Sequence, residues 1–169
     1  MFAALTITAS AAGKANMLIM DLKSGRVIIE LTPELAPKHV ARIRKLANDG
    51  FYDGLKFHRV IEGFMAQTGD PQGTGAGGSD LADLDAEFTG ERFERGVLGM
   101  ARTSDPNSAN SQFFIMLAAA PHLNGQYTVF GRVTEGMDAV DAIKKGSRAA
   151  NGAVDDPDRI VRMRTADKL

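Results

Sequence analysis

Residues 57–70 read Phe57-His58-Arg59-Val60-Ile61-Glu62-Gly63-Phe64-Met65-Ala66-Gln67-Thr68-Gly69-Asp70. This stretch places a cation, Arg59, among large apolar residues. A guanidinium cannot be deprotonated in a protein, so Arg59 must meet water, a protein partner, or a ligand carbonyl or anion. Alternate side chains of an extended segment share a face, so Arg59, Met65 and Gln67 line one surface if Glu62-Gly63 only bends the strand. Phe64, beside the bend, reaches the same surface, and we expect a site there.

A second extended segment, residues 111–117, has the same two-faced character. Its residues Gln112, Phe114 and Met116 alternate with Phe113, Ile115 and Leu117. One face is typical of a core and the other of a site. Together the two segments offer an apolar floor, two side-chain amides and one guanidinium, contributed by Met65, Phe114, Gln67, Gln112 and Arg59. This set suits a neutral peptide better than an acid–base reaction.

Three motifs in this order identify a family. They are Phe57-His58-Arg59-Val60-Ile61 with Gly63-Phe64-Met65, Gln67 and Gly69-Asp70; Ser111-Gln112-Phe113-Phe114-Ile115; and Val129-Phe130-Gly131. The chain resembles the cyclophilin family of peptidyl-prolyl cis-trans isomerases over residues 16–164. The resemblance implies an enzyme that catalyses rotation about X-Pro peptide bonds and assists protein folding. Its expected partners are proline-containing polypeptides.

The resemblance also assigns the site. It implies Arg59 and Gln67 as catalytic residues, and as substrate-binding residues Phe64, Met65, Ala101, Arg102, Gln112, Phe114, His122, Leu123 and Tyr127. Leu123 is expected in the proline pocket, and the backbone of Ala101 and Arg102 is expected to bind the peptide. His122 stands where many eukaryotic relatives carry tryptophan, and Tyr127 where many carry histidine. These differences, familiar in bacterial members, imply weak binding of cyclosporin.

Composition limits the possible partners. The chain has 169 residues, 44% hydrophobic and 24% charged, which suits one soluble globular domain. Its 20 basic and 21 acidic residues form no long run of either sign, so we expect neither a nucleic-acid nor a membrane partner, and a monomer. The absence of cysteine excludes disulfides, a thiol nucleophile and cysteine-ligated metal.

The first fifteen residues differ from the rest. Residues 1–15 are small and apolar, and their first basic residue, Lys14, follows the apolar run instead of preceding it. A secretory signal has the opposite order. We therefore expect an N-terminal extension (1–15), an isomerase domain (16–169) and a cytoplasmic protein. The alternative is a periplasmic protein, if residues 1–15 are the remnant of a signal.

The remaining pattern is mainly β. Residues 17–22 and 27–31 predict a hairpin across residues 23–26, and further strands are expected at 96–101, 128–133 and 160–164. Apolar residues at helical spacing predict two helices. The first begins at Pro37 and ends at Gly50, and the second covers residues 137–145 and ends at Gly146. Roughly eight strands and two helices leave a sandwich or an α+β fold open. The resemblance selects a closed eight-stranded antiparallel barrel capped by two α-helices.

Other features have a structural interpretation. Residues 69–78 are glycine-rich and predict a loop, in which a G-x-G-x-x-G match lacks the βαβ context of a dinucleotide site. The resemblance implies a surface loop beside the groove, and residues 80–85 depart from the family pattern. We expect His58 to be a hydrogen-bonded structural histidine facing away from Arg59. We expect a solvated helix face formed by Lys38, Arg42, Arg44 and Lys45.

The chemistry favours an isomerase without a cofactor. Rotation about an X-Pro bond breaks amide resonance, so the proline nitrogen gains a lone pair that a donor stabilises more than it stabilises the planar ground state. Arg59 is the candidate donor. The three histidines form no H-E-x-x-H pair and G-x-S-x-G is absent, so we expect neither a metal site nor a serine hydrolase. The alternative is a non-catalytic proline-peptide binding module or chaperone. Such a protein would not need a guanidinium at the proline nitrogen, so the presence of Arg59 favours the enzyme.

Overall fold

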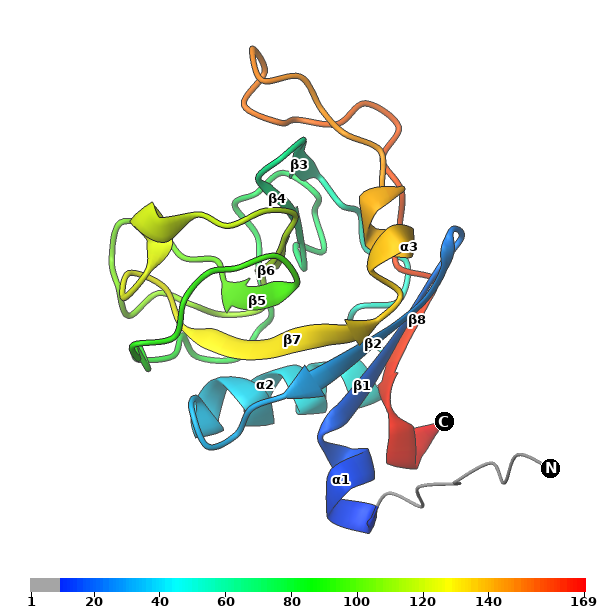
Figure 1. The fold of residues 1–169 in the computed structure, drawn as a ribbon, viewed down its shortest axis with the longest axis vertical. Helices are drawn as coiled ribbons and strands as arrows, with labels where there is room; N and C mark the ends of the chain where they lie inside the picture. The colour runs from blue at the N-terminus through cyan, green and yellow to red at the C-terminus, as the bar shows by residue number, and fades with distance from the viewer. Residues whose placement is uncertain (1–9) are drawn as a thin grey trace, which may run out of the picture.

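The computed structural model describes residues 10–169. Of the expected extension 1–15, residues 1–9 lie outside the described residues, and residues 11–15 form a short helix that was not predicted. The elements in chain order (Figure 1) are α1 (Ala11–Ala15), β1 (Met17–Leu22), β2 (Gly25–Leu31), α2 (Pro37–Asn48), β3 (Arg59–Ile61), β4 (Met65–Thr68), β5 (Val97–Met100), β6 (Phe113–Met116), β7 (Val129–Glu135), α3 (Met137–Asp141) and β8 (Arg162–Thr165). Two 3₁₀ turns complete the list, η1 (Pro121–Leu123) and η2 (Ala166–Lys168). None of the helices in residues 10–169 is long and apolar enough to span a bilayer.

The eight strands form one antiparallel sheet in the order β3-β4-β6-β5-β7-β2-β1-β8, which curls around the core (Figure 1). The mainly β architecture with eight antiparallel strands is confirmed. No ladder within residues 10–169 pairs the edge strands β3 and β8, so closure into a barrel is not confirmed. The gap between these edges is bridged irregularly, with Phe57 N donating to Asp158 O at 2.9 Å and Gly54 N to Ile160 O at 2.7 Å.

Two reversals of the chain are tighter than expected. The β1–β2 turn has only two residues, since Gly25 already pairs with Leu22. Glu62-Gly63 does not bend a continuous strand, because Gly63, at φ +71°, allows the chain to reverse into the β3–β4 hairpin. This reversal places Arg59 directly opposite Gln67 in the ladder. The expected shared face is therefore formed by a cross-strand pair.

The two expected helices are present. In Figure 1, α2 lies below β7 and α3 above it, and they contact β8 and β2 respectively. Helix α2 begins at Pro37 and buries one apolar face, formed by Val40, Ile43, Leu46 and Ala47. Helix α3 ends at Asp141, earlier than expected, because Lys144 N donates to the Asp158 carboxylate at 2.9 Å instead of to a helix carbonyl.

Apolar residues form two clusters on opposite faces of β6. Phe113, Ile115 and Leu117 belong to the main core inside the curled sheet. Phe114 and Met116 belong to a second cluster, which also contains Met65, Phe93 and Leu123. The alternation predicted for residues 111–117 is therefore confirmed. The second cluster lies under the candidate site.

Candidate active site

A cavity of about 480 Å³ brings most of the predicted site together. Nine predicted residues line it: Arg59, Phe64, Met65, Gln67, Ala101, Arg102, Phe114, Leu123 and Tyr127. Gln112 lines an adjoining cavity of about 300 Å³. His122 lines neither cavity, but its ring centroid lies 5.7 Å from that of Phe64. The three strands β3, β4 and β6 thus meet residues 101–102 and 123–127, which are distant in sequence, around one cavity.

The apolar floor is built on the ring of Phe114. This ring stacks on Phe93 at a centroid distance of 5.7 Å and meets Tyr127 edge-on at 5.6 Å. Gly99 makes the packing possible, because a Cβ there would lie 2.5 Å from the Phe114 ring. Phe114 is only 5% exposed and Met65 only 2%, so these two side chains are held firmly by their neighbours and present only a small apolar surface to the cavity. Such a surface suits the ring of a proline.

A chain of hydrogen bonds forms the polar wall. Arg59 Nη1 donates to Gln67 Oε1 at 3.3 Å, and Gln67 Nε2 donates to Gln112 Oε1 at 2.9 Å. Gln112 Nε2 in turn donates to the carbonyls of Gly75 at 3.0 Å and Gly77 at 2.9 Å. Because Arg59 can only donate, this chain fixes the orientation of both amides. The two predicted glutamines therefore hold the guanidinium and the glycine-rich loop together.

Arg102 forms the opposite rim of the cavity. Its Nε and Nη2 donate to the carbonyl of Gln126 at 3.0 and 2.8 Å, and its guanidinium carbon lies 4.6 Å from the Tyr127 ring centroid. Ala101 N donates to Gln112 O at 3.0 Å, which commits this N–H to the protein. The side chain of Arg102 is thus a structural part of the rim, and its charge lies beside an aromatic face.

Asp70 organises the glycine-rich loop. Its carboxylate, 1% exposed, accepts hydrogen bonds from the backbone N–H groups of Gln72, Thr74, Gly75 and Gly77 at 2.7–3.1 Å. Burial raises the pKa of the Asp70 carboxyl, but these N–H groups lower it more, and the pKa lies below its ordinary value. A side chain at position 77 would collide with this carboxylate. The predicted loop is therefore ordered around one buried charge.

We expect Asp70→Asn to lower the free energy of unfolding by about 1–2 kcal/mol at pH 7, because an amide NH₂ would face N–H donors. The carboxyl pKa is depressed in the folded state, so its stabilisation is present above the unfolded-state pKa of about 4 and is lost as the pH falls through the folded-state pKa. Urea unfolding from pH 7 to pH 3 should show the two proteins converging below about pH 4. Asp49→Asn, at an exposed position, is the control. If the difference in unfolding free energy between the parent and Asp70→Asn did not change with pH, the role of the charge would be contradicted.

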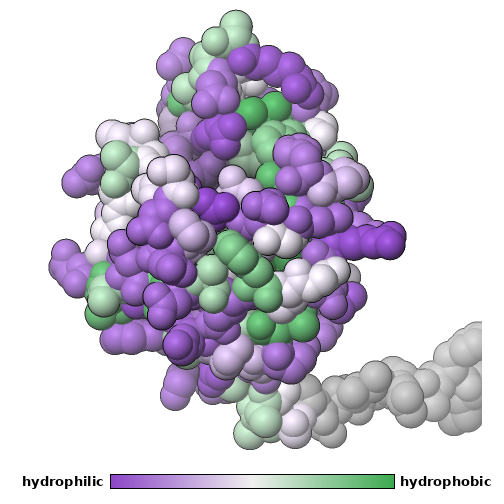
Figure 2. Space-filling view, turned by 90° about the vertical axis from the view of Figure 1, so that its left-hand side faces the viewer, coloured by the Kyte–Doolittle hydropathy of each residue, from purple (hydrophilic) through white to green (hydrophobic). Residues whose placement is uncertain are grey.

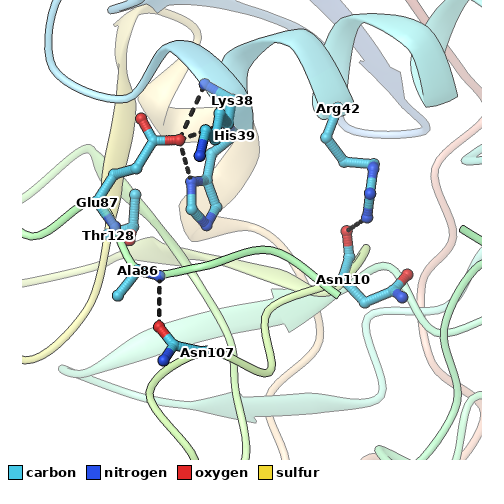
Figure 3. Close-up of polar contacts among 8 residues, drawn as sticks. All are labelled: Lys38, His39, Arg42, Ala86, Glu87, Asn107, Asn110 and Thr128. Carbon is cyan, nitrogen blue, oxygen red and sulfur yellow. Dashed lines mark hydrogen bonds and ion pairs between the residues drawn. The ribbon is translucent and has the colours of Figure 1, made fainter. Parts of the chain in front are cut away.

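Residues 80–85, which depart from the family pattern, belong to a segment, 79–88, that is held against α2. Glu87 Oε1 accepts from the backbone N–H of Lys38 and His39 at 2.9 and 3.2 Å, and lies 2.9 Å from His39 Nδ1 (Figure 3). Burial lowers the pKa of His39, although the bond to Glu87 opposes this shift. Since a carboxylate only accepts, Nδ1 carries the proton of the neutral ring. Glu87 thereby satisfies free N–H groups at the start of α2.

The expected solvated face of α2 is wrong at one residue. Arg42 Nη1 donates to Asn110 O at 3.1 Å (Figure 3), and its Nη2 donates to Ala82 O at 2.6 Å. Asn110 in turn donates from Nδ2 to Leu81 O and to Asp83 Oδ1, at 2.9 and 3.0 Å. Arg42 and Asn110 thus fix the rim of the adjoining cavity to α2. Charge spacing alone did not distinguish this anchoring arginine from its solvated neighbours.

Six residues line the main cavity without having been predicted, namely His58, Thr74, Gly75, Ala150, Asn151 and Ala153. The expectation that His58 faces away from Arg59 is wrong, because both residues line this cavity. The His58 ring is buried at the cavity wall. Burial lowers the pKa of His58, while the nearby Asp70 carboxylate and a hydrogen bond to the backbone of Lys56 oppose the shift. No pattern in the sequence places residues 150–153 beside β3, because their approach is a long-range contact.

The part of the chain that the structure describes gathers no group of three or more histidine, aspartate or glutamate side chains suited to a metal ion. The cavity therefore presents N–H donors, amides and apolar rings. It contains two half-buried guanidinium groups: that of Arg59 lies next to the apolar floor, and that of Arg102 donates to Gln126 O at the rim. Such an arrangement can bind an uncharged peptide and place a donor beside one of its bonds.

Comparison with known proteins identifies what the chain is similar to. The family model "Cyclophilin type peptidyl-prolyl cis-trans isomerase/CLD" matches residues 17–165. A "Probable peptidyl-prolyl cis-trans isomerase" from Brucella suis is 57% identical, over 95% of this chain and 90% of the relative. "Peptidyl-prolyl cis-trans isomerase B" from Bacillus subtilis is 47% identical over 72% of this chain and 85% of its own.

Solved structures agree. The crystal structure of a cyclophilin from Hirschia baltica superimposes with a TM-score of 0.82 at 32% identity, covering 92% of this chain and 76% of the other. A cyclophilin-type isomerase from Cryptosporidium parvum, crystallised in the presence of the dipeptide Ala-Pro, gives a TM-score of 0.81 at 30% identity. That match covers 88% of this chain and 98% of the other.

Proposed function

The chain belongs to the cyclophilin family of peptidyl-prolyl cis-trans isomerases, and from this premise we propose that the cavity around Arg59 is the place where it rotates X-Pro bonds. One observation carries the proposal: the guanidinium of Arg59 and the apolar floor of Phe114 and Met65 line the same cavity. The proline ring lies on the floor, and the guanidinium faces its nitrogen. The crystal structure of the C. parvum relative in the presence of the dipeptide Ala-Pro supports a ligand of this class.

The proposed mechanism stabilises the rotated state of the bond. Rotation meets a barrier of about 18–20 kcal/mol, and the twisted nitrogen accepts a hydrogen bond that the planar amide cannot. An acceleration of about 10⁵ requires roughly 7 kcal/mol. One hydrogen bond from a charged donor contributes about 1.5–3 kcal/mol of this. The remainder comes from desolvation, and from the floor gripping the proline while the wall of Gln67 and Gln112 holds the peptide.

A protease-coupled assay on a short X-Pro peptide tests this proposal. The isomerase accelerates the slow phase of cleavage in proportion to its concentration. The alternative, a binding module or chaperone, sequesters the peptide and leaves the slow phase unchanged or slower. An absence of acceleration at enzyme concentrations that bind the peptide would favour the alternative.

We expect the isomerase to need no cofactor. The site offers neither a cluster of metal-ligating side chains within residues 10–169 nor the βαβ context of a nucleotide site. Dialysis against EDTA should leave kcat/KM unchanged. Loss of activity on chelation, with recovery on addition of a divalent ion, would contradict this expectation.

Cyclosporin is expected to inhibit weakly. An exposed imidazole, His122, stands beside Phe64 where many eukaryotic relatives carry tryptophan, and it offers a large ligand less apolar area. His122→Trp should therefore lower the inhibition constant for cyclosporin by about tenfold or more, with little change in kcat/KM. Equal inhibition of both proteins would show that position 122 does not limit cyclosporin binding.

The proposal includes a monomeric isomerase without nucleic-acid or membrane partners. The face seen in Figure 2 is mostly hydrophilic, with small separate apolar groups, and the large apolar residues exposed within residues 10–169 are Leu81, Phe88, Val161 and Leu169. Scattered apolar residues do not make a dimer interface. Sedimentation equilibrium tests the monomer.

The proposal also includes a cytoplasmic location. It rests on the position of Lys14 after the apolar run, and cell fractionation tests it.

The proposal also covers the closed barrel and the domain boundary at residue 16. Irregular hydrogen bonds between residues 54–57 and 158–160 support closure. Slow amide exchange at Phe57 and Ile160 is expected if these bonds close the sheet.

A variant lacking residues 1–15 tests the domain boundary, since it should retain activity if the domain begins at residue 16.

A further inference from the structure

Asn151 holds the Arg59 guanidinium from the side opposite Gln67. Arg59 Nε donates to the backbone oxygen of Asn151 at 3.0 Å, and Nη2 donates to Asn151 Oδ1 at 3.2 Å. The Nε and Nη2 edge is the one that a carboxylate occupies in a bidentate pair. Here two oxygens of one neutral residue occupy it.

The backbone of Asn151 is specialised for this contact. Its φ is +53°, in the left-handed region that asparagine tolerates better than most residues. In this conformation the main-chain and side-chain oxygens reach the same edge of the guanidinium. Only one other non-glycine residue within residues 10–169, Asp156 at φ +50°, has a positive φ.

Segment 146–154, part of the excursion between α3 and β8 at the top of Figure 1, is fixed to the free edge of β3. Gly146 N donates to Val60 O, and Val60 N donates to Gly152 O, both at 2.9 Å. Arg148 Nη2 donates to Glu62 O at 2.8 Å. Gly152, at φ +80°, lies so close to β3 that a Cβ would be 2.5 Å from Ile61 Cγ1. The strand that carries Arg59 therefore also sets the position of Asn151.

We propose that Asn151 is a positioning residue for the isomerase reaction, which orients the Arg59 guanidinium without neutralising its charge. With Gln67 it engages three of the five N–H groups of the guanidinium, leaving one on each terminal nitrogen for the substrate. None of the ion pairs among residues 10–169 includes Arg59, so its charge has no acidic partner there. An amide in this position keeps the donor both oriented and fully charged.

Two variants test the inference, which rests on the proposed role of Arg59. Asn151→Gly keeps the left-handed backbone and its oxygen but removes Oδ1, and it should lower kcat about three- to tenfold with little change in KM. Asn151→Asp keeps the acceptor but adds a charge that competes for the donor. It should lower kcat at least as much, with an unchanged or raised melting temperature. The matched control is Asp156→Gly. It replaces the other non-glycine residue with a left-handed backbone by glycine, at a position away from Arg59, and should keep parental activity.

A double-mutant cycle separates positioning from a structural role. In an Arg59→Ala background, Asn151→Gly should have no further effect on kcat/KM, since it acts through the guanidinium. Parental kcat in both Asn151 variants, or an equal loss from Asn151→Gly with and without Arg59, would overturn the inference. If Arg59→Ala itself retains full activity, the proposed function of the cavity fails. If only the Asn151 variants retain it, the role of Arg59 stands and this inference fails.

Discussion

Arg59→Ala is expected to lower kcat/KM for X-Pro peptides by more than tenfold, at least about 1.4 kcal/mol, while leaving the fold nearly unchanged. Within residues 10–169, the variant removes the only guanidinium that both lines the main cavity and reaches Gln67. Arg59 is half-buried at the cavity wall, so its truncation opens no void in the main core. The protease-coupled assay measures the loss, and thermal unfolding serves as the control for folding.

Arg59→Lys is the sharper variant. Lysine keeps the positive charge but lacks the planar fork that meets Asn151 through Nε and Nη2 and Gln67 through Nη1. Most of the loss should therefore persist. Full activity in Arg59→Ala, at unchanged thermal stability, would leave only the binding module. Recovery of full activity in Arg59→Lys would show that charge alone is sufficient.

Local pattern predicted the two faces of residues 111–117 well. The period of two in residues 111–117 separated Phe113 from Phe114, and the structure places these rings in different clusters. Pattern failed where one residue decides the path of the chain. Gly63 allows a full reversal of the chain where a bend was expected. Helix α3 ends early because Lys144 N donates to the Asp158 carboxylate, fourteen positions away in sequence. Such choices depend on tertiary partners that are not adjacent in sequence.

The site was predicted where strands or family motifs carry it, and missed where long-range contacts complete it. Arg59 and Gln67 lie eight positions apart in one hairpin, whereas Asn151 is 92 positions from Arg59. An Asn-Gly pair at 151–152 indicates only a turn. The contact of Asn151 with Arg59 forms only because segment 146–154 pairs with the free edge of β3. Arg42 was missed for the same reason, since its acceptors Asn110 and Ala82 are distant in sequence.

Phe114→Ala is expected to cost about 3–5 kcal/mol of unfolding free energy and to weaken proline binding. The ring is 5% exposed and supports both Phe93 and Tyr127, so its removal leaves a void beneath the cavity. Urea unfolding measures the first effect, and KM for an X-Pro peptide the second. A folded variant that turns over peptides as fast as the parent would place Phe114 in the core alone.

A matched pair separates the floor from the core without such a large loss of stability. Phe113→Leu and Phe114→Leu each remove one aromatic ring from the same strand, on opposite faces. Both should destabilise the fold by about 1–2 kcal/mol, because leucine refills only part of the space. Only Phe114→Leu should raise KM, since Phe114 lines the cavity and Phe113 packs against Tyr52 and Phe130 in the core. An equal rise of KM in both variants would mean that the cavity responds to global stability and not to the ring at its floor.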